Sequence, residues 1–126
     1  MARTKSPHLT DAELRLMDVV WNKGEATVTD VVQGLGKKVP LAYSTVLTTL
    51  RILENKGYLS HVKAGRAFIY KPAVERDAAR ESALRHLVRR FFDDSPDLLL
   101  LNLLERKKIS ASELAKLKKR IEEEQA

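Results

Sequence analysis

Thr45, Thr48 and Arg51 are spaced three residues apart, so they share one face of any helix that contains them. Arginine pairs with the O6 and N7 atoms of guanine, and threonine suits phosphate oxygens and the methyl group of thymine. We therefore expect this face to contact DNA; an ordinary solvated surface is the alternative. Tyr43 carries a hydroxyl that suits phosphate, but capping or packing explains this aromatic residue equally well.

A helix predicted over residues 44–56 positions these side chains. Its apolar residues fall mostly at helical spacing on the opposite face and are Val46, Leu47, Leu50, Ile52 and Leu53. Gly57 ends the helix as a C′ residue does. Two β-rich runs then flank a turn at residues 64–65, with Lys63 and Arg66 at its tip. In a winged helix-turn-helix, such a helix enters the major groove and such a hairpin reaches phosphate.

The residues before this helix predict another helix and a short strand. Thr10 and Glu13 have the spacing of a capping box, which begins the first helix. Its apolar stripe consists of Leu14, Met17, Val20 and Trp21. The helix ends at residues 22–24. Residues 26–28 suit a short strand that completes the sheet of the hairpin.

A second short helix is predicted to begin at Thr29 and Asp30 and to stop at Gly36. It buries Val31, Val32 and Leu35. The order of helix, strand, helix, helix and hairpin is specific to the winged helix-turn-helix. We therefore predict a mainly α fold with a small β-hairpin wing. Residues 1–72 form the DNA-binding domain, and residues 1–8 form a flexible arm whose Arg3 and Lys5 are placed to touch the DNA backbone.

Residues 73–126 predict helices alone. One helix has an apolar stripe, a second begins at Pro96 and holds the run LLLLNLL at 98–104, and a third begins at Ser110. The stripes of the first and last helices are Leu84, Leu87, Val88, Phe91, Phe92, Leu114, Leu117 and Ile121. So small a unit cannot bury this surface alone. We expect a helical dimerisation domain and a symmetric homodimer; the alternative is that these helices fold back on the DNA-binding half.

Positive charge is concentrated in the first part of the chain. The 126 residues include 23 Lys+Arg and 17 Asp+Glu, and residues 1–72 hold 11 basic and 6 acidic residues, a net +5. Phosphate binding requires such an electrostatic footprint. The opening residues lack the apolar core of a signal peptide, and the run at 98–104 is too short to span a bilayer. We expect a soluble cytoplasmic protein.

The sequence shows no set of residues for catalysis or metal binding. There is no cysteine, which excludes disulfides, thiolate metal sites and cysteine nucleophiles. His8, His61 and His86 are scattered and show neither i,i+4 pairing nor a nearby carboxylate pattern. No nucleophile elbow, P-loop, dinucleotide fingerprint or HExxH occurs. We expect neither an enzyme nor a cofactor.

Several motifs follow one another in a specific order. They are L-T-x-A-E at 9–13, Val20-Trp21, T-V-x-T-x-L at 45–50, K-G-Y-L at 56–59, G-R-x-F-x-Y-x-P at 65–72 and a late leucine-rich helix containing L-N. Together they resemble the penicillinase-repressor family of the BlaI/MecI/CopY type, over residues 9–125. The resemblance implies a dimeric repressor with an N-terminal winged helix domain and a C-terminal helical dimerisation domain. Such repressors bind palindromic operators ahead of resistance or stress operons.

The resemblance also implies particular DNA contacts. On the reading helix and the wing these are Ser44, Thr45, Thr48, Arg51, Lys63 and Arg66. Leu47 departs from members that carry a basic residue at this position. The copper-responsive members use a C-terminal cysteine motif, so this chain, which has no cysteine, is not a metal sensor of that kind.

In family members that respond to β-lactams, a membrane sensor-protease triggers cleavage after an asparagine in the dimerisation helix. Leu101-Asn102 matches that motif, although Leu103 stands where such members often have phenylalanine. The resemblance thus implies a candidate cleavage site between Asn102 and Leu103. A register-setting role for a buried Asn102 at the dimer seam explains the residue equally well.

These observations predict a dimeric DNA-binding transcriptional repressor. It binds a palindromic operator of double-stranded DNA and is released by cleavage or disruption of its dimerisation helices. The alternative is a ligand-sensing winged helix regulator whose helical tail holds a small molecule and that is not controlled by proteolysis. A winged helix that binds only protein is less favoured, because the net +5 of residues 1–72 and the Thr/Arg face suit DNA.

Overall fold

Reciprocal capping fixes the starts of the first two helices. Thr10 Oγ1 accepts a hydrogen bond from Glu13 N at 3.1 Å, and Glu13 Oε1 accepts one from Thr10 N at 2.9 Å, so the capping box begins α1 (Asp11–Lys23) as predicted. Thr27 and Asp30 repeat this exchange ahead of α2 (Val28–Leu35). The start predicted at Thr29 is wrong, because the Thr27 side chain caps the helix and Thr29 already lies inside it.

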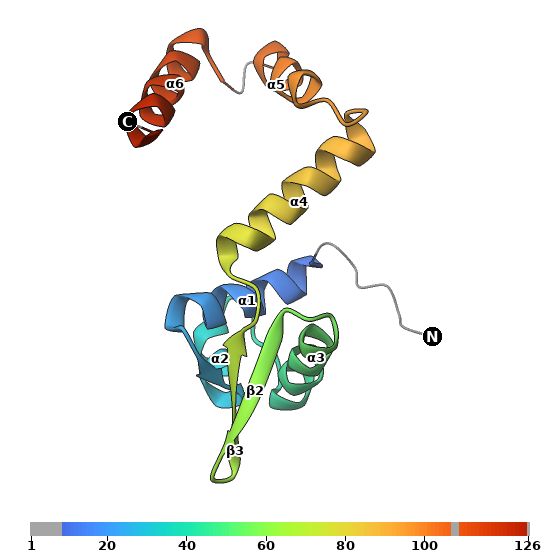
Figure 1. The fold of residues 1–126 in the computed structure, drawn as a ribbon. Helices are drawn as coiled ribbons and strands as arrows, with labels where there is room; N and C mark the ends of the chain where they lie inside the picture. Colours follow the sequence, from blue (N-terminus) through green and yellow to red (C-terminus); the bar gives the residue numbers. More distant parts are fainter. Residues whose placement is uncertain (1–8, 107–108, 126) are drawn as a thin grey trace. The chain divides into compact units, whose positions relative to one another are not determined.

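The computed structural model describes residues 9–106 and 109–125; the expected arm with Arg3 and Lys5 lies outside them, as does His8. After α1, the elements of the first unit are β1 (Ala26–Thr27), α2, α3 (Tyr43–Asn55), β2 (Leu59–Ala64) and β3 (Ala67–Pro72) (Figure 1). The chain divides into two units, residues 1–83 and residues 84–126. Helices with one small sheet confirm the predicted mainly α fold with a β-hairpin wing.

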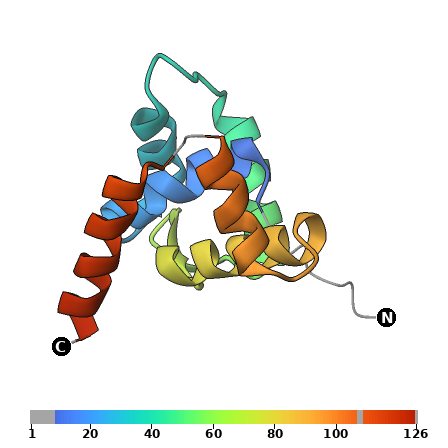
Figure 2. The same cartoon turned by 90° about the horizontal axis from the view of Figure 1, so that it is seen from above.

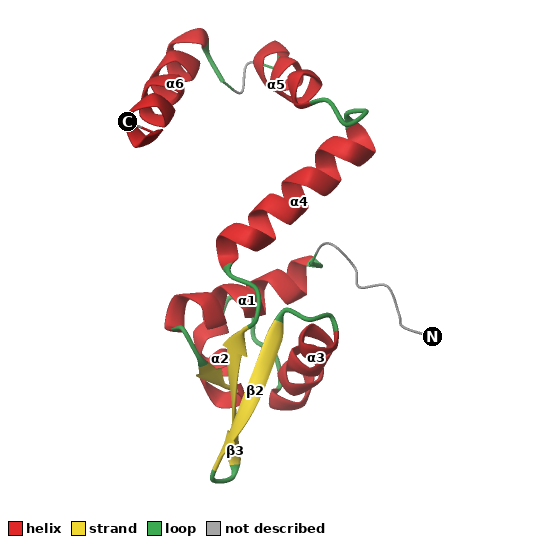
Figure 3. Ribbon diagram, in the orientation of Figure 1, coloured by secondary structure: helices red, strands yellow, loops and turns green. Residues whose placement is uncertain are grey.

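The sheet has three antiparallel strands in the order β1-β3-β2 (Figure 3). Ala26 pairs with Tyr70, so the short strand completes the hairpin sheet as predicted. Ala64 pairs with Ala67, which leaves a two-residue turn. Gly65 adopts a φ of 62° in that turn, and a positive φ at the first central position is what a type II′ hairpin turn requires.

Three helices and the sheet share one core. Its fully buried side chains are Leu16, Met17, Val20, Val31, Val46, Leu50, Leu53 and Tyr70. The stripe predicted for α1 is wrong in one member, because Leu16 is buried and Leu14 is 42% exposed. Glu13, Leu16, Met17 and Val20 form the inward i, i+3, i+4, i+7 series, and Leu14 lies beside that series.

Close approach of α1 and α2 depends on Gly34. A Cβ atom built on this residue would lie 2.6 Å from Val19 Cγ1, which is far inside van der Waals contact. The absence of a side chain therefore lets the two helices pack directly. The same residue carries a cost in helix propensity, which this packing offsets.

The first unit continues past the hairpin into α4 (Arg76–Phe91). Val74 and Ala79 pack against the core, and Trp21 Nε1 donates a hydrogen bond to Val74 O at 2.9 Å. The compact unit therefore extends to Ala83. The division of roles predicted at Pro72, with DNA binding before it and dimerisation after it, stays a prediction.

The second unit contains the later turns of α4, then α5 (Pro96–Glu105) and α6 (Ala111–Gln125). Pro96 stands in the first turn of α5 and Ser95 Oγ accepts a hydrogen bond from Leu98 N, as the predicted helix start requires. Neither α5 nor α6 buries any described residue. No described helix is long and apolar enough to cross a membrane.

Candidate nucleic-acid interface

The outer face of α3 carries the predicted DNA-contacting side chains. Thr45, Thr48 and Arg51 are all exposed, and the opposite face buries Val46, Leu50 and Leu53 completely. Ser44 and Tyr43 are also exposed at the start of the helix, Tyr43 to 56%. Packing against α1 and α2 thus holds α3 so that its polar face stays in solvent.

Two further residues share that face. At about 100° per residue, Ile52 and Asn55 project from the same side of α3 as Thr48, and both are exposed. The assignment of Ile52 to the buried face is wrong: it is 42% exposed, because it lies outside the spacing of Val46, Leu50 and Leu53. Asn55 could have been found from the same helical angle, since it follows Thr48 by seven residues.

The hydroxyl of Thr48 already donates a hydrogen bond within the helix. Thr48 Oγ1 donates to Ser44 O at 2.9 Å, and Thr49 Oγ1 donates to Thr45 O at 2.9 Å. A threonine hydroxyl has one proton to donate. While this bond holds, Thr48 offers its methyl group and oxygen lone pairs to a neighbour, but no hydrogen-bond donor.

The wing carries two basic side chains at its tip. Lys63 is the last residue but one of β2, Arg66 lies in the hairpin turn, and both are exposed. Within the described ranges, none of the ion pairs includes Arg51, Lys63 or Arg66. These three positive charges are therefore not neutralised by neighbouring carboxylates and remain open to an anionic partner.

An ion-pair geometry joins the base of the wing to α3. His61 Nδ1 on β2 lies 2.7 Å from Glu54 Oε1 on α3. The His61 ring centre is 4.9 Å from that of Phe68 and 5.6 Å from that of buried Tyr70, and burial raises the pKa of the Tyr70 phenol. The expectation that His61 has no nearby carboxylate is therefore wrong, because the fold brings together residues seven apart on different elements.

A second ion pair fixes the end of α3 against the start of α1. Glu13 is buried, and its Oε1 accepts from Lys56 Nζ at 2.8 Å. Burial raises the pKa of Glu13, but hydrogen bonds from Lys56 and from the Thr10 backbone outweigh it, so the net pKa is lowered. The charged carboxylate thus stabilises the position of the helix that carries the polar face.

The connection between α2 and α3 adds basic charge that the sequence prediction did not assign to DNA. Figure 2 shows this loop extending away from the helices; Lys37 and Lys38 are exposed on it. Ala42 then precedes α3 without a side-chain capping bond. Helix N-termini of this kind favour anions through their unpaired backbone N–H groups.

The predicted cleavage-site residues belong to the second unit. Asn102 is exposed on α5 and Leu103 is half-buried, so the burial expected for Asn102 is absent from the single chain. Across residues 9–106 and 109–125, no cluster of three or more His, Cys, Asp or Glu side chains is arranged to hold a metal ion.

Comparison with known proteins gives consistent matches along the chain. A family model described as penicillinase repressor matches residues 9–123. A penicillinase repressor of Bacillus licheniformis is 32% identical over 119 residues, covering 94% of this chain and 93% of the relative. A transcriptional regulator BlaI of Mycobacterium tuberculosis is also 32% identical, covering 80% and 86%. The solved DNA binding domain of the repressor BlaI is 33% identical with a TM-score of 0.52, over 62% of this chain and 93% of that one.

Proposed function

The chain belongs to the penicillinase repressor family, as its motifs predicted, and we propose that it is a homodimeric transcriptional repressor that binds an inverted-repeat operator. The observation that carries this proposal is the exposed Thr/Arg face of α3 beside a hairpin whose tip carries Lys63 and Arg66, neither of which forms an ion pair with a described carboxylate. A repressor of this kind meets DNA in the cytoplasm and carries out no catalysis.

Each protomer contacts the DNA bases with α3 and the DNA backbone with the wing. Arg51 is placed to pair with a guanine edge, and Thr45 and Thr48 contact neighbouring bases or the backbone. Ser44 and Tyr43, at the open start of α3, contact phosphate. Contacts of α3 set the sequence preference, and Lys63 and Arg66 add sequence-independent affinity through phosphate.

Exposed apolar surface in the second unit supports dimerisation. The large apolar side chains left exposed there are Leu84, Leu87, Phe91, Leu98, Leu100, Leu101, Leu117 and Ile121. A groove between α5 and α6 is lined mainly by apolar residues, with Leu100, Leu114 and Leu117 among them. Exposed apolar surface on this scale is typical of a protein interface, and a second copy of the same helices would cover it symmetrically. The groove does not favour the alternative of a ligand in the helical tail, because few polar groups there could orient one.

Release of the repressor by cleavage between Asn102 and Leu103 is part of the proposal. A bond inside a helix resists a protease until the helix opens locally. Helix α5 buries no described residue in the single chain, so its local opening is inexpensive once dimer contacts loosen. A membrane sensor-protease is the partner that the family resemblance implies. Cleavage here removes α6 and part of α5 from the dimer interface and leaves the first unit intact.

Selection from random DNA duplexes tests the proposed function. The intact chain should enrich an inverted repeat whose half-sites lie about 10 bp apart or slightly more, because two copies of α3 enter successive major grooves. Affinity for the selected duplex should fall steeply with salt. Sedimentation should give a dimer for the intact chain and a monomer for residues 1–83. Enrichment of a single unrepeated site, or a monomeric intact chain, would contradict the proposal.

A further inference from the structure

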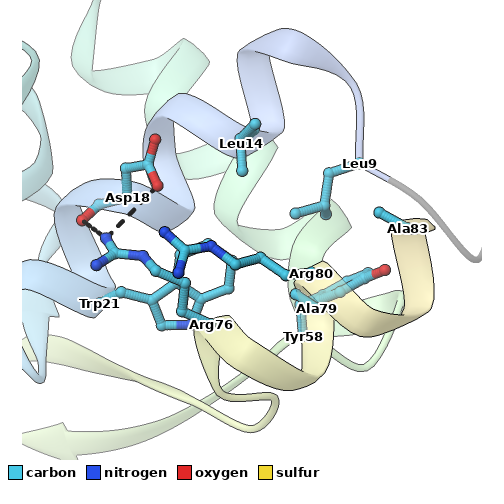
Figure 4. A pocket seen from close by; sticks show the side chains of 9 residues that line it. All are labelled: Leu9, Leu14, Asp18, Trp21, Tyr58, Arg76, Ala79, Arg80 and Ala83. Carbon is cyan, nitrogen blue, oxygen red and sulfur yellow. Dashed lines mark hydrogen bonds and ion pairs between the residues drawn. The ribbon is translucent and has the colours of Figure 1, made fainter. Parts of the chain in front are cut away.

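A cavity of about 370 Å³ lies in the first unit, between α1 and the first turns of α4 (Figure 4). One wall is α1, and another is formed by the first turns of α4. Its lining consists of Leu9, Leu14, Asp18, Trp21, Tyr58, Arg76, Ala79, Arg80 and Ala83. All of these residues belong to the first unit. The volume falls in the range of small-molecule sites, and DNA binding as proposed above makes no use of it.

The cavity has a charged end and an apolar end. Figure 4 shows both guanidinium groups, of Arg76 and Arg80, at the end where Asp18 stands, and Leu9 and Ala83 at the other end. The charged residues of the lining, two arginines and one aspartate, carry a net charge of +1; Asp77, which pairs with Arg80, is 95% exposed and does not line the cavity. Because an unbalanced charge in a partly enclosed site favours a counter-ion, this end suits a single negative charge.

Arg76 is held in place by its neighbours. Its Nη2 lies 2.9 Å from Asn22 Oδ1 and 3.5 Å from Asp18 Oδ1, and its Cζ stands 5.3 Å from the Trp21 ring centre. These contacts bind α4 to α1 through Nη2 of this guanidinium. Arg76 therefore holds α4 against α1 and adds positive charge to the cavity.

Arg80 is the more exposed of the two arginines and is held less firmly by its neighbours. Its ion pair with Asp77 joins Nη1 to Oδ1 at 3.5 Å, between side chains that are 72% and 95% exposed. An exposed pair of this length contributes little free energy and is readily exchanged. A carboxylate in the cavity would offer Arg80 a shorter, two-point contact on a partly enclosed surface.

We propose that this cavity binds a small organic monocarboxylate with an aromatic or branched apolar body. The carboxylate pairs with the Arg80 guanidinium beside Arg76, and the apolar body lies against Leu14 and the Leu9–Ala83 end. The bound ligand contacts both α1 and the first turns of α4, the helix that continues out of the first unit. This site goes beyond the proposed DNA binding and does not depend on it.

Trp21 provides a direct reporter of occupancy. It is the single tryptophan of the chain, so a nitrogen-15 correlation spectrum of the intact protein has one indole N–H signal. That N–H donates to Val74 O next to the cavity. Titration with benzoate should move the signal saturably. Benzamide, which is neutral, and acetate, which lacks the apolar body, should each bind at least about tenfold more weakly.

Two substitutions and a control test the geometry. Arg80→Gln should reduce benzoate affinity about tenfold, to near that of benzamide, and Ala83→Phe should block benzoate by filling the apolar end. Arg89→Gln, a matched exposed change farther along α4, should leave the titration unchanged. A single indole signal at a folded-state position, distinct from that of the denatured chain, in each free variant shows that the unit is folded. A linear, unsaturable benzoate titration, equal binding of benzamide, or full benzoate affinity in Arg80→Gln would overturn the proposal.

Discussion

Arg51 projects from α3 into solvent and takes part in none of the ion pairs of the described residues. If it reads guanine, Arg51→Ala should weaken operator binding by about 1–3 kcal/mol and relax the preference at one base pair. Fluorescence anisotropy on the selected operator and its single-base variants measures both effects. Lys63→Ala and Arg66→Ala are the matched comparison: each should weaken all sequences alike and lower the salt slope. Unchanged affinity and preference in Arg51→Ala would mean that α3 meets DNA with another face.

Thr48 should act on DNA through its methyl group, because its hydroxyl donates to Ser44 O within the helix. Thr48→Ser removes the methyl group and should lower affinity by about 0.8 kcal/mol, roughly fourfold. Thr48→Val keeps the shape and should have a smaller effect. If the partner is a thymine, deoxyuridine at that base should weaken wild-type binding similarly and add little to Thr48→Ser. A larger loss in Thr48→Val than in Thr48→Ser would show that the hydroxyl is the functional group instead.

Helix α3 owes its position partly to the Glu13–Lys56 ion pair with α1. The pKa of Glu13 is lowered in the folded chain from its ordinary value of 4.5. Its contribution to stability is therefore complete above that ordinary value and is lost as pH falls through the lowered folded value. Glu13→Gln should reduce the free energy of unfolding by about 1–3 kcal/mol at neutral pH, and the deficit should shrink in acid.

Denaturant unfolding across the acid range measures this deficit. Glu25→Gln is the control, since Glu25 is an exposed carboxylate of the same unit and its neutralisation should change stability little. A Glu13→Gln deficit of the same size at neutral pH and well below pH 4.5 would contradict the assigned role of the charge.

In the proposed mechanism, release depends on helix α5. Truncation after Asn102 should leave the first unit folded, with the Trp21 indole signal unchanged, while operator binding at physiological salt is lost. Without the dimer contacts that join the two DNA-binding units, the free energy of operator binding should weaken by ~3 kcal/mol, which is roughly a hundredfold in affinity. The truncated chain can be compared with Asn102→Ala in the intact chain, which should dimerise normally unless this residue sets the dimer register. A truncated chain that bound as tightly as the intact one would exclude cleavage here as the switch.

The sequence predicted most elements of the first unit because their signals are local. The Thr10–Glu13 capping box, the spacing of Val46, Leu50 and Leu53, and the glycine turn of the hairpin each depend on a few neighbouring residues. Errors arose where a side chain's surroundings decide its role. Ile52 looked buried by composition, yet the helical angle turns it outward.

Contacts between residues far apart in the sequence could not be predicted from the sequence. The Glu54–His61 and Glu13–Lys56 pairs need α3 to be placed against β2 and α1 first. The cavity beside Trp21 likewise depends on packing of the first turns of α4 against α1. For the same reason, the compact first unit extends to Ala83, although Pro72 is the stronger signal in the sequence.

The proposed repressor, taken as a whole molecule, binds DNA through two weak contacts joined by a dimer. One winged helix is expected to make few phosphate contacts, and we propose that the second unit raises affinity by holding a second copy at high effective concentration. The spacing of the operator half-sites should therefore matter as much as their sequence. Inserting half a helical turn, about 5 bp, between half-sites should abolish the gain, because the two α3 helices would face opposite sides of the duplex.

The most direct test is to compare binding of the intact chain to the selected inverted repeat and to a duplex with one half-site. We expect two chains per inverted repeat, bound cooperatively, and an affinity for the single half-site at least about a hundredfold weaker at physiological salt. Analytical ultracentrifugation with labelled DNA gives both stoichiometry and affinity. One chain per duplex, with equal affinity for the repeat and the half-site, would contradict the central claim.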